Sequence, residues 1–465
     1  MRAEHTVEAI RNVKPTAVVV AIALGLVLVG ALLAPAEAQT SRTSRVAGPD
    51  PRIGRDIGVD RELPREPRPD TEHCGDYGSI EQTLRGGTSW KMCWHVDAKT
   101  GLVLEKIAVR PPGEDDYLMV LDSAALAQLN VPYDSGENQW NDITSYGLGG
   151  RYVQTMTPQE CPGGRLRSAW TGYEDVVKPV LCLQRQDAGI AYRSMTGNSS
   201  GTGPLYTAIA EELVVSMISK IDWYEYVTEW RFADNGQISA SLGATGDLAP
   251  NDYTINDYGW PIGVGEGADA STNHYHSAFW RLDWNLAGEG GEKVEQYDTV
   301  DTGEMGRRAR ILKTVKTEIT EEASLSTANR RWWRVVSPTS KNADGHARSY
   351  ELELGANDVY EPNPETTPDV SFTEHRPCEK FASFNQDPEC SATSIPEYVA
   401  DRETLTDPVM WVRVGFHHIP RDEDQSPMPM HWQGFDLVPR DFTAQSMLTP
   451  EGRRYVNGRV GRPTS

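Results

Sequence analysis

The chain has 465 residues and carries 67 Asp and Glu residues against 45 Lys and Arg residues, a formal net charge of −22. This length is enough for one large domain or for two of ordinary size. A surface this acidic repels phosphate groups, which argues against nucleic acid as a partner, and it attracts small cations instead.

The first 38 residues have the features of a secretory signal peptide. Basic residues precede an apolar run over 17–36, and the small-x-small sequence Ala36-Glu37-Ala38 follows as a cleavage site. We expect cleavage after Ala38 and therefore a secreted or otherwise extracytoplasmic protein. The apolar run, at about 20 residues, is also long enough to span a bilayer. An uncleaved anchor is thus the alternative, and only this segment would then contact the membrane.

Residues 39–72 are rich in Pro, Arg and Asp and contain almost no large apolar side chains, a composition that predicts a disordered linker. We expect one folded domain over 73–455 and a short C-terminal tail over 456–465. Only the signal or anchor and the linker would then precede the folded domain.

The chain contains six cysteines, an even number, and in an exported protein this indicates disulfide bonds. None lies in a Cys-x-x-Cys sequence, so a thiolate metal site is not expected. Fifteen pairings are conceivable for six cysteines. The simplest joins sequence neighbours, namely Cys74 with Cys93, Cys161 with Cys182, and Cys378 with Cys390.

Short strands and turns dominate the folded part. Apolar and polar residues alternate over 86–109 around a turn at 97–101, which is typical of a hairpin. The segment 224–246 contains two strand patterns joined by Asn235-Gly236, a dipeptide that favours tight hairpin turns. Helical periodicity is weak except over about 204–219. The pattern predicts an all-β fold, a large antiparallel β-sandwich.

Two of the ten histidines, His274 and His276, lie in NHYHSAFWRLD (273–283). In a β-strand, residues i and i+2 point to the same face, so both imidazoles can converge on one point and form half of a metal site. The alternative is a pair of surface histidines in a loop.

Several further stretches decide between these interpretations, because together with the histidine pair they resemble the copper amine oxidases. They run from about residue 86 to 443 in the order in which that family has them. The stretches are GLVLEKIAV (101–109), VPYDSGENQWNDITSYGLG (131–149), PVLCLQRQDAGIAYRS (179–194), SKIDWYEYVTEW (219–230) and FHHIPRDEDQSPMPMHWQGFDLVP (416–439).

The resemblance implies the family's catalytic supersandwich, here without the small α/β domains that usually precede it, and a homodimer. It also implies a copper site made by His274, His276 and His418. His417 is the alternative third ligand. Adjacent strand residues point to opposite faces, so only one of His417 and His418 can bind the metal with the other two histidines. Imidazoles suit Cu(II), although zinc would bind the same ligands.

In the family, a tyrosine is oxidised by bound copper and O₂ to the cofactor topaquinone. The resemblance assigns this role to Tyr224, with the register set by Trp230 six residues later. Trp223 replaces the asparagine that usually precedes the tyrosine. Strand alternation predicts that Trp223 points away from the site.

The resemblance makes Asp142 the catalytic base, Tyr133 the residue that hydrogen-bonds the quinone, and Trp140 the gate of a channel reshaped by a shorter loop. A carboxylate can serve as the base if burial raises its pKa toward the working pH. The resemblance also pairs Cys161 with Cys182. It places a second, calcium site at Asp283, Asn285 and Asp407, since oxygen ligands suit Ca²⁺.

The sequence therefore predicts a secreted copper and topaquinone primary-amine oxidase. It would convert a small primary amine and O₂ to an aldehyde, ammonia and hydrogen peroxide. The alternative is an inactive copper-binding scaffold or assembly subunit on the same fold.

Overall fold

The computed structural model describes residues 71–450, apart from 196–204, 250–252, 255–256, 264–269, 287, 289 and 329. The predicted signal peptide (1–38), the linker up to residue 70 and the tail (456–465) lie outside the described residues. The first described element is the helical turn α1 (Thr71–Cys74), which begins two residues before the expected start of the domain. No described helix is long and apolar enough to cross a lipid bilayer.

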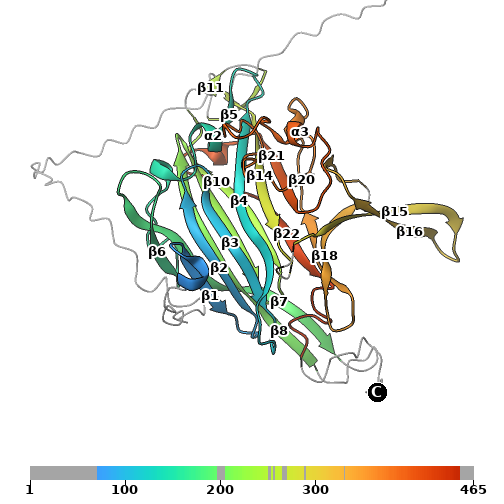
Figure 1. Cartoon of the computed structure of the whole chain (residues 1–465). Coiled ribbons are helices and arrows are strands. Elements are labelled where there is room, and N and C mark those ends of the chain that lie inside the picture. Colours follow the sequence, from blue (N-terminus) through green and yellow to red (C-terminus); the bar gives the residue numbers. More distant parts are fainter. Residues whose placement is uncertain are drawn as a thin grey trace, which may run out of the picture. The chain divides into compact units, whose positions relative to one another are not determined.

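Two large antiparallel sheets make up most of this region, which confirms the all-β prediction (Figure 1). The first sheet has nine strands in the order β1-β2-β3-β4-β14-β21-β20-β17, with β5 paired to β4. Its strands are β1 (Gly78–Thr83), β2 (Ser89–Asp97), β3 (Gly101–Arg110), β4 (Leu118–Pro132), β5 (Gln139–Asn141), β14 (His274–Trp284), β17 (Ala323–Leu325), β20 (Val370–Glu374) and β21 (Pro408–His418).

The second sheet has ten strands in the order β16-β15-β18-β19-β22-β10-β9-β8-β7-β6. Its strands are β6 (Arg165–Trp170), β7 (Val177–Met195), β8 (Leu205–Ile221), β9 (Tyr224–Ala233), β10 (Ile238–Gly246), β15 (Lys293–Met305), β16 (Arg310–Ile319), β18 (Trp332–Lys341), β19 (Ala347–Leu354) and β22 (Met428–Arg440).

Small elements complete the described chain. A three-stranded sheet has the order β11-β13-β12. Its strands and the short helices are β11 (Tyr253–Thr254), β12 (Gly259–Pro261), β13 (Ala270–Thr272), α2 (Asp142–Ser145), α3 (Ile395–Tyr398), η1 (Gly150–Tyr152), η3 (Pro364–Thr366) and η4 (Asp422–Asp424).

Both hairpins expected from turn residues are present. In the β2–β3 turn, Asp97 pairs with Gly101, and the Asp97 carboxylate accepts the backbone N–H groups of Lys99 and Thr100. In the β9–β10 turn, Gly236 adopts φ +91°, a conformation that glycine reaches without steric cost. The local sequence therefore determines these two turns.

The helix indicated by the periodicity over 204–219 is not formed, because residues 205–221 form β8. This strand pairs with β7 along one edge and with β9 along the other. It carries β-branched residues such as Val214 and Val215, which are stiff in helices and pack well on sheets. Pairing on both edges satisfies its backbone groups and overrides the weak local pattern.

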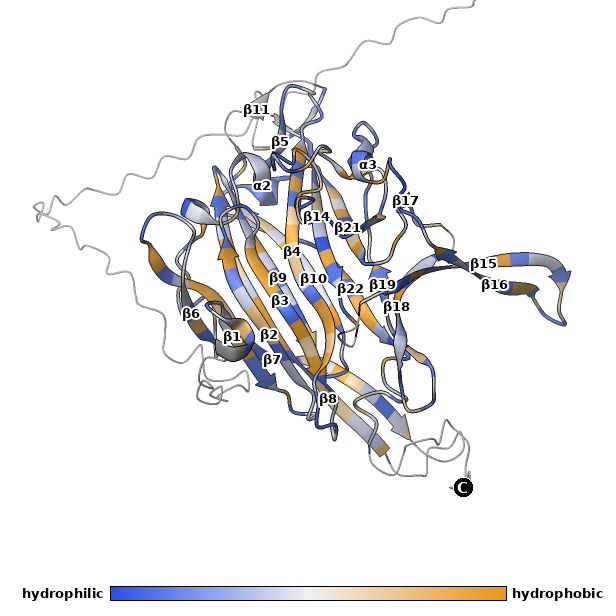
Figure 2. Cartoon of the chain, viewed as in Figure 1, coloured by the Kyte–Doolittle hydropathy of each residue, from blue (hydrophilic) through white to orange (hydrophobic). Residues whose placement is uncertain are grey.

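The core lies between the two sheets, where apolar residues recur along the facing strands (Figure 2). Trp230 of β9 meets Trp280 of β14 edge to face, with ring centroids 5.1 Å apart. Trp90 of β2 packs on Phe232 of β9 at the same centroid distance, 5.1 Å. All four side chains are fully buried. The first contact holds β14 against β9, two strands that carry predicted site residues, and the second holds β2 against β9.

All three predicted disulfides are formed. The Cα–Cα distances are 5.5 Å for Cys74–Cys93, 5.6 Å for Cys161–Cys182 and 5.3 Å for Cys378–Cys390. Each bond closes a short loop between chain neighbours, which restricts the unfolded chain and so stabilises the fold.

The β15–β16 hairpin extends beyond the sheet that it belongs to (Figure 1). Strand β18 pairs with β15 only over residues 293–297, whereas β16 follows β15 as far as Met305. Among the described residues, the two strands in the outer part of the hairpin therefore pair only with each other.

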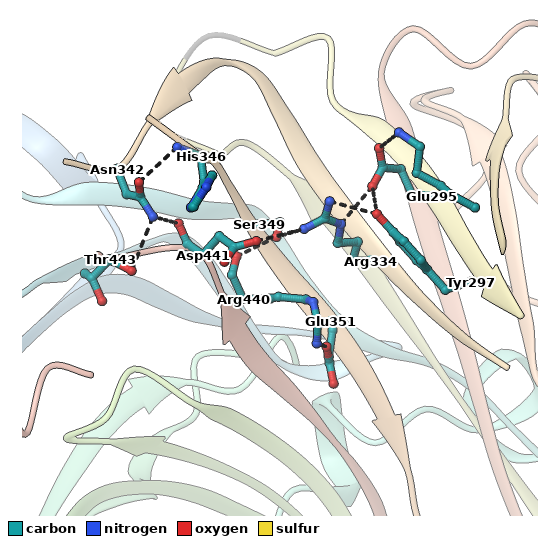
Figure 3. Close-up of polar contacts among 11 residues, drawn as sticks. Glu295, Tyr297, Arg334, Asn342, His346, Ser349, Glu351, Arg440, Asp441 and Thr443 are labelled. Carbon is teal, nitrogen blue, oxygen red and sulfur yellow. Dashed lines mark hydrogen bonds and ion pairs between the residues drawn. The ribbon is translucent and has the colours of Figure 1, made fainter. Parts of the chain in front are cut away.

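A buried carboxylate anchors the root of this hairpin (Figure 3). Glu295 accepts hydrogen bonds from Arg334 Nε (2.8 Å), Lys316 Nζ (2.6 Å) and the Tyr297 hydroxyl (2.6 Å). Arg334 also donates to Asp441, just beyond β22, at 3.2 Å. Because bonds to charged groups are stronger than neutral ones, this network fixes β15 to β16 and β18.

Candidate metal centre and active site

Three predicted histidines meet between neighbouring strands. Strands β14 and β21 are antiparallel, and their register places His274 directly opposite His418. His276 lies two residues along β14 and shares the same face. All three rings are buried, and one nitrogen of each lies within 4.8 Å of the others.

His417 lies on the opposite face of β21. Its ring stacks on Tyr275 with centroids 4.2 Å apart, and its Nε2 lies 3.0 Å from Asp134 Oδ2. Strand alternation thus separates the two adjacent histidines, and His418 is the one that joins the pair on β14.

Hydrogen bonds fix which nitrogen faces the centre. His274 Nδ1 lies 3.1 Å from the Thr272 carbonyl, to which it donates, so its Nε2 carries the lone pair. His418 Nε2 lies 3.1 Å from the Asp424 carboxylate and donates to it, so its Nδ1 carries the lone pair. These two lone-pair nitrogens face each other at 3.2 Å. Two acceptors at this distance repel each other unless a cation lies between them.

The electrostatics of the cluster also suit a metal ion. Burial lowers the pKa of His274 to about 3, and it lowers the pKa of His276 well below its usual value. Both rings are therefore neutral, as metal ligands must be. Neither nitrogen of the fully buried His276 has a hydrogen-bond partner among the described residues. Buried polar groups without a partner lower the stability of the fold, and coordination of a metal ion would satisfy one of the two nitrogens.

Asp424 and His431 extend the cluster, and the sequence analysis missed both. The Asp424 carboxylate lies 3.1 Å from His418 Nε2 and 3.1 Å from His431 Nε2. Burial alone would raise the pKa of Asp424, but its contacts with the two histidines outweigh burial and hold that pKa at about 2. A histidine that binds a metal through one nitrogen usually donates its other ring N–H to a carboxylate. A carboxylate close to His418 in the sequence could therefore have indicated Asp424.

Tyr224 lies at the edge of the histidine cluster. It is the first residue of β9, directly after the tight turn that leaves β8, and only 7% of it is exposed. Its hydroxyl lies 2.8 Å from His274 Nε2. Its ring meets the edge of His276 with centroids 5.3 Å apart. A metal held by the histidines would therefore lie beside this phenol.

Asp142 begins the short helix α2 and is buried. The Tyr226 hydroxyl donates to its Oδ2 at 3.1 Å. Burial raises the pKa of Asp142 to about 7, although the bond from Tyr226 acts in the opposite direction. The sequence analysis missed Tyr226, which shares a strand face with Tyr224 because it lies two residues further along β9.

A cavity of about 80 Å³ joins Tyr224 to Asp142. Tyr133 and Trp140 also line it, and the Tyr133 ring stacks on His274 with centroids 4.7 Å apart. Trp140 is 39% exposed, so it lies at the mouth. A larger cavity of about 420 Å³, lined by residues of 111–118, 341–348 and 443–449, contains none of the predicted site residues.

The predicted orientation of Trp223 is wrong. Trp223 lines the cavity together with Asp142 and Tyr224, and 45% of it is exposed. The residue belongs to the turn between β8 and β9 rather than to a strand, so the alternation of strand side chains does not apply to it.

The predicted calcium ligands have other partners. Asp283 lies 3.2 Å from His375 Nε2 and 3.4 Å from Arg281 Nη1. The Asn285 amide donates to Asp122 at 2.9 Å. Burial raises the pKa of Asp407, as does the nearby charge of Asp283. Asp283 and Asp407 thus lie close enough to interact, while His375 compensates the charge of Asp283.

Comparisons with known proteins show what this chain is similar to. A family model described as "Copper amine oxidase, enzyme domain" matches residues 87–451. Primary amine oxidase 1 of Arabidopsis thaliana is 26% identical over 414 residues, which cover 76% of this chain and 60% of the relative. Histamine oxidase of Arthrobacter globiformis is 26% identical over 401 residues, which cover 79% and 57%.

A solved structure shares the fold. The copper-containing benzylamine oxidase of Hansenula polymorpha has a TM-score of 0.67 at 20% identity, and the match covers 85% of this chain and 65% of that one. The chain spans about 60% of the length of the curated relatives that it matches.

Proposed function

Because the chain belongs to the copper amine oxidase family, we propose that it is a primary-amine oxidase whose topaquinone is made from its own Tyr224. A primary amine, O₂ and water would give an aldehyde, ammonia and hydrogen peroxide. One observation carries the proposal. The Tyr224 hydroxyl contacts the histidine cluster, while the same residue lines the cavity that contains Asp142.

The histidines fit copper. His274 would bind through Nε2 and His418 through Nδ1, because hydrogen bonds engage their other nitrogens. His276 would supply the third nitrogen. Copper and topaquinone would together supply the redox chemistry, in which electrons pass from the amine to O₂.

The side chains of the protein would carry out the proton transfer. Asp142 faces the cavity and would accept the proton from the carbon next to the amine nitrogen. Its raised pKa, about 7, suits a base that must both take and release a proton near neutral pH. Tyr226 holds the carboxylate in place from one side. Burial of Tyr133 and Tyr224 keeps bulk water away from the reacting atoms.

We infer a homodimer from the family and from the β15–β16 ribbon. Two-stranded ribbons are marginally stable alone. Its exposed apolar side chains would gain from burial against a second subunit. These side chains are Val300, Met305, Ile311, Leu312 and Val315.

Export is likewise part of the proposal. Three disulfides support it, because such bonds form and persist mainly in oxidising compartments.

Cofactor formation tests the function. Protein purified without copper should be colourless, and addition of copper in air should generate a quinone that reacts with phenylhydrazine. Tyr224→Phe should bind copper and generate no quinone. Tyr275→Phe is the matched control, since Tyr275 lies on the histidine strand but stacks on His417 at the opposite face. If wild-type protein binds copper and stays unreactive, the chain is a copper-binding scaffold instead.

A further inference from the structure

The cavity of about 420 Å³ contains no residue of the histidine centre. Three parts of the chain line it, namely the connection between β3 and β4, the turn end of the β18–β19 hairpin, and the segment that follows β22. Pockets that hold small ligands usually have volumes of roughly 300–1,000 Å³. The cavity is therefore large enough for a small molecule.

Hydrogen bonds from one buried side chain hold two of these walls together (Figure 3). Asn342 Oδ1 accepts the backbone N–H groups of Asp344 and His346, both at 3.0 Å, which closes the turn between β18 and β19. Asn342 Nδ2 donates to the carbonyl of Asp441, just beyond β22, at 2.9 Å. This side of the cavity is therefore fixed before any ligand binds.

Arg348 brings a positive charge to the cavity without an acidic partner. Its Nη1 donates to the Phe442 carbonyl, and its buried Nε has no hydrogen-bond partner among the described residues. No described carboxylate forms an ion pair with it. The charge of Glu114 acts on Arg348 through space, yet burial outweighs this effect and lowers the pKa of Arg348. An anion in the cavity would supply the missing negative charge.

Gln445 lines the same cavity and also lacks partners. Its side-chain Nε2 and Oε1 are both buried, and neither has a hydrogen-bond partner among the described residues. A carboxylate can accept hydrogen bonds from the Gln445 amide nitrogen and from Arg348, but it cannot donate to the amide oxygen. A hydroxyl group beside the carboxylate can. Neither side chain is fully buried, so a ligand in the cavity can contact both.

We propose that this cavity binds a small hydroxy acid, with its carboxylate on Arg348 and Gln445 and its hydroxyl on the Gln445 amide oxygen. The planar guanidinium of arginine matches the geometry of a carboxylate. Lys341 also lines the cavity, is exposed and forms no ion pair with a described residue, so it can bind a second carboxylate. Glu114 is the only acidic residue of the lining, against these two basic ones, which favours an anionic ligand.

Calorimetric titration of the full chain tests the site with three probes at constant pH and ionic strength. Malate carries two carboxylates and a hydroxyl group, whereas succinate lacks only the hydroxyl. Malate should bind about fivefold more tightly than succinate, the scale of one hydrogen bond between neutral groups. Inorganic phosphate should bind more weakly than malate. The proposal is overturned if malate does not bind at millimolar concentration, or if phosphate binds more tightly than malate.

Two variants separate the contributions of the two side chains. Arg348→Gln should weaken malate binding about tenfold, the scale of one hydrogen bond to a charged group. Arg440→Gln is the matched control, because Arg440 pairs with Glu351 and does not line the cavity. It should leave the malate affinity unchanged. Equal affinity in wild type and Arg348→Gln would contradict the site.

Gln445→Leu keeps the test independent of folding. The Gln445 side chain makes no hydrogen bond with a described residue, so its replacement breaks none and should not lower Tm in the absence of ligand. Arg348 also bonds the Phe442 carbonyl, so the unliganded Tm of its variant must be measured as well. Gln445→Leu should bind malate and succinate equally. A preference for malate that persists in this variant would refute the role of the amide.

Discussion

Tyr226→Phe isolates the one hydrogen bond that described residues make to the Asp142 side chain. The Tyr226 hydroxyl donates to Asp142 Oδ2 at 3.1 Å, and this bond favours the charged carboxylate. Burial already raises the pKa of Asp142 to about 7. A bond to a charged group contributes about 1.5 kcal/mol or more, and one pKa unit corresponds to about 1.4 kcal/mol. Its loss should therefore raise the pKa of Asp142 by about one unit.

The expected result is a shift of the pH profile. A base acts only when deprotonated, so kcat/KM should fall toward acid with a midpoint near the pKa of Asp142. In Tyr226→Phe this acidic limb should move up by about one pH unit, while kcat/KM at high pH falls much less. The assay is hydrogen peroxide formation from one monoamine across the pH range, in both proteins.

Tyr350→Phe is the matched control. Tyr350 is also a fully buried tyrosine, but its hydroxyl donates to the Gly236 carbonyl at 2.8 Å. Both variants lose one buried bond and about 1 kcal/mol of unfolding free energy, whereas only Tyr226→Phe should move the acidic limb. A limb that stays in place or moves to lower pH in Tyr226→Phe would refute the assignment of Asp142 as the base.

Three further predictions follow from the described contacts. Asp424→Asn should weaken copper binding at least about tenfold in a chelator competition, because it releases the histidine that the carboxylate orients; unchanged affinity would exclude this role. Calcium must displace His375 from Asp283, so it should raise Tm only at about millimolar concentration, and saturation at micromolar calcium would contradict this. Glu295→Gln should lower the free energy of unfolding in urea by about 1.5 kcal/mol, since it removes the charge that Arg334 Nε and Lys316 Nζ bind while Arg334 keeps its contact with Asp441, and a change below about 0.5 kcal/mol would show that the network is dispensable.

The ordered motifs by themselves indicated the family, and strand alternation indicated that only one of His417 and His418 can join the pair on β14. Both inferences depend on local features, since successive side chains of any strand point to opposite faces. The disulfides were predictable for a similar reason, because each joins cysteines that are neighbours in the sequence.

Local reasoning failed where the residue or segment was not in the assumed conformation. Trp223 was assigned to a strand face, but it lies in a two-residue turn and lines the cavity. The helical pattern over 204–219 was overridden by pairing with strands on both edges. The first outcome was decided by the two-residue turn between β8 and β9, and the second by pairing of β8 with the strands that precede and follow it in the chain.

By itself, the sequence determined the fold class, the disulfide pairs and the candidate residues of the metal centre and active site, because motifs, spacings and strand periodicity are properties of the linear sequence. Only the tertiary structure decided how those residues meet. The register of β14 against β21 sets His274 opposite His418. The contact of Tyr226 with Asp142 joins residues 84 positions apart. Such contacts depend on how two sheets pack around a shared core, and burial there, rather than the residue type, gives Asp142 its raised pKa.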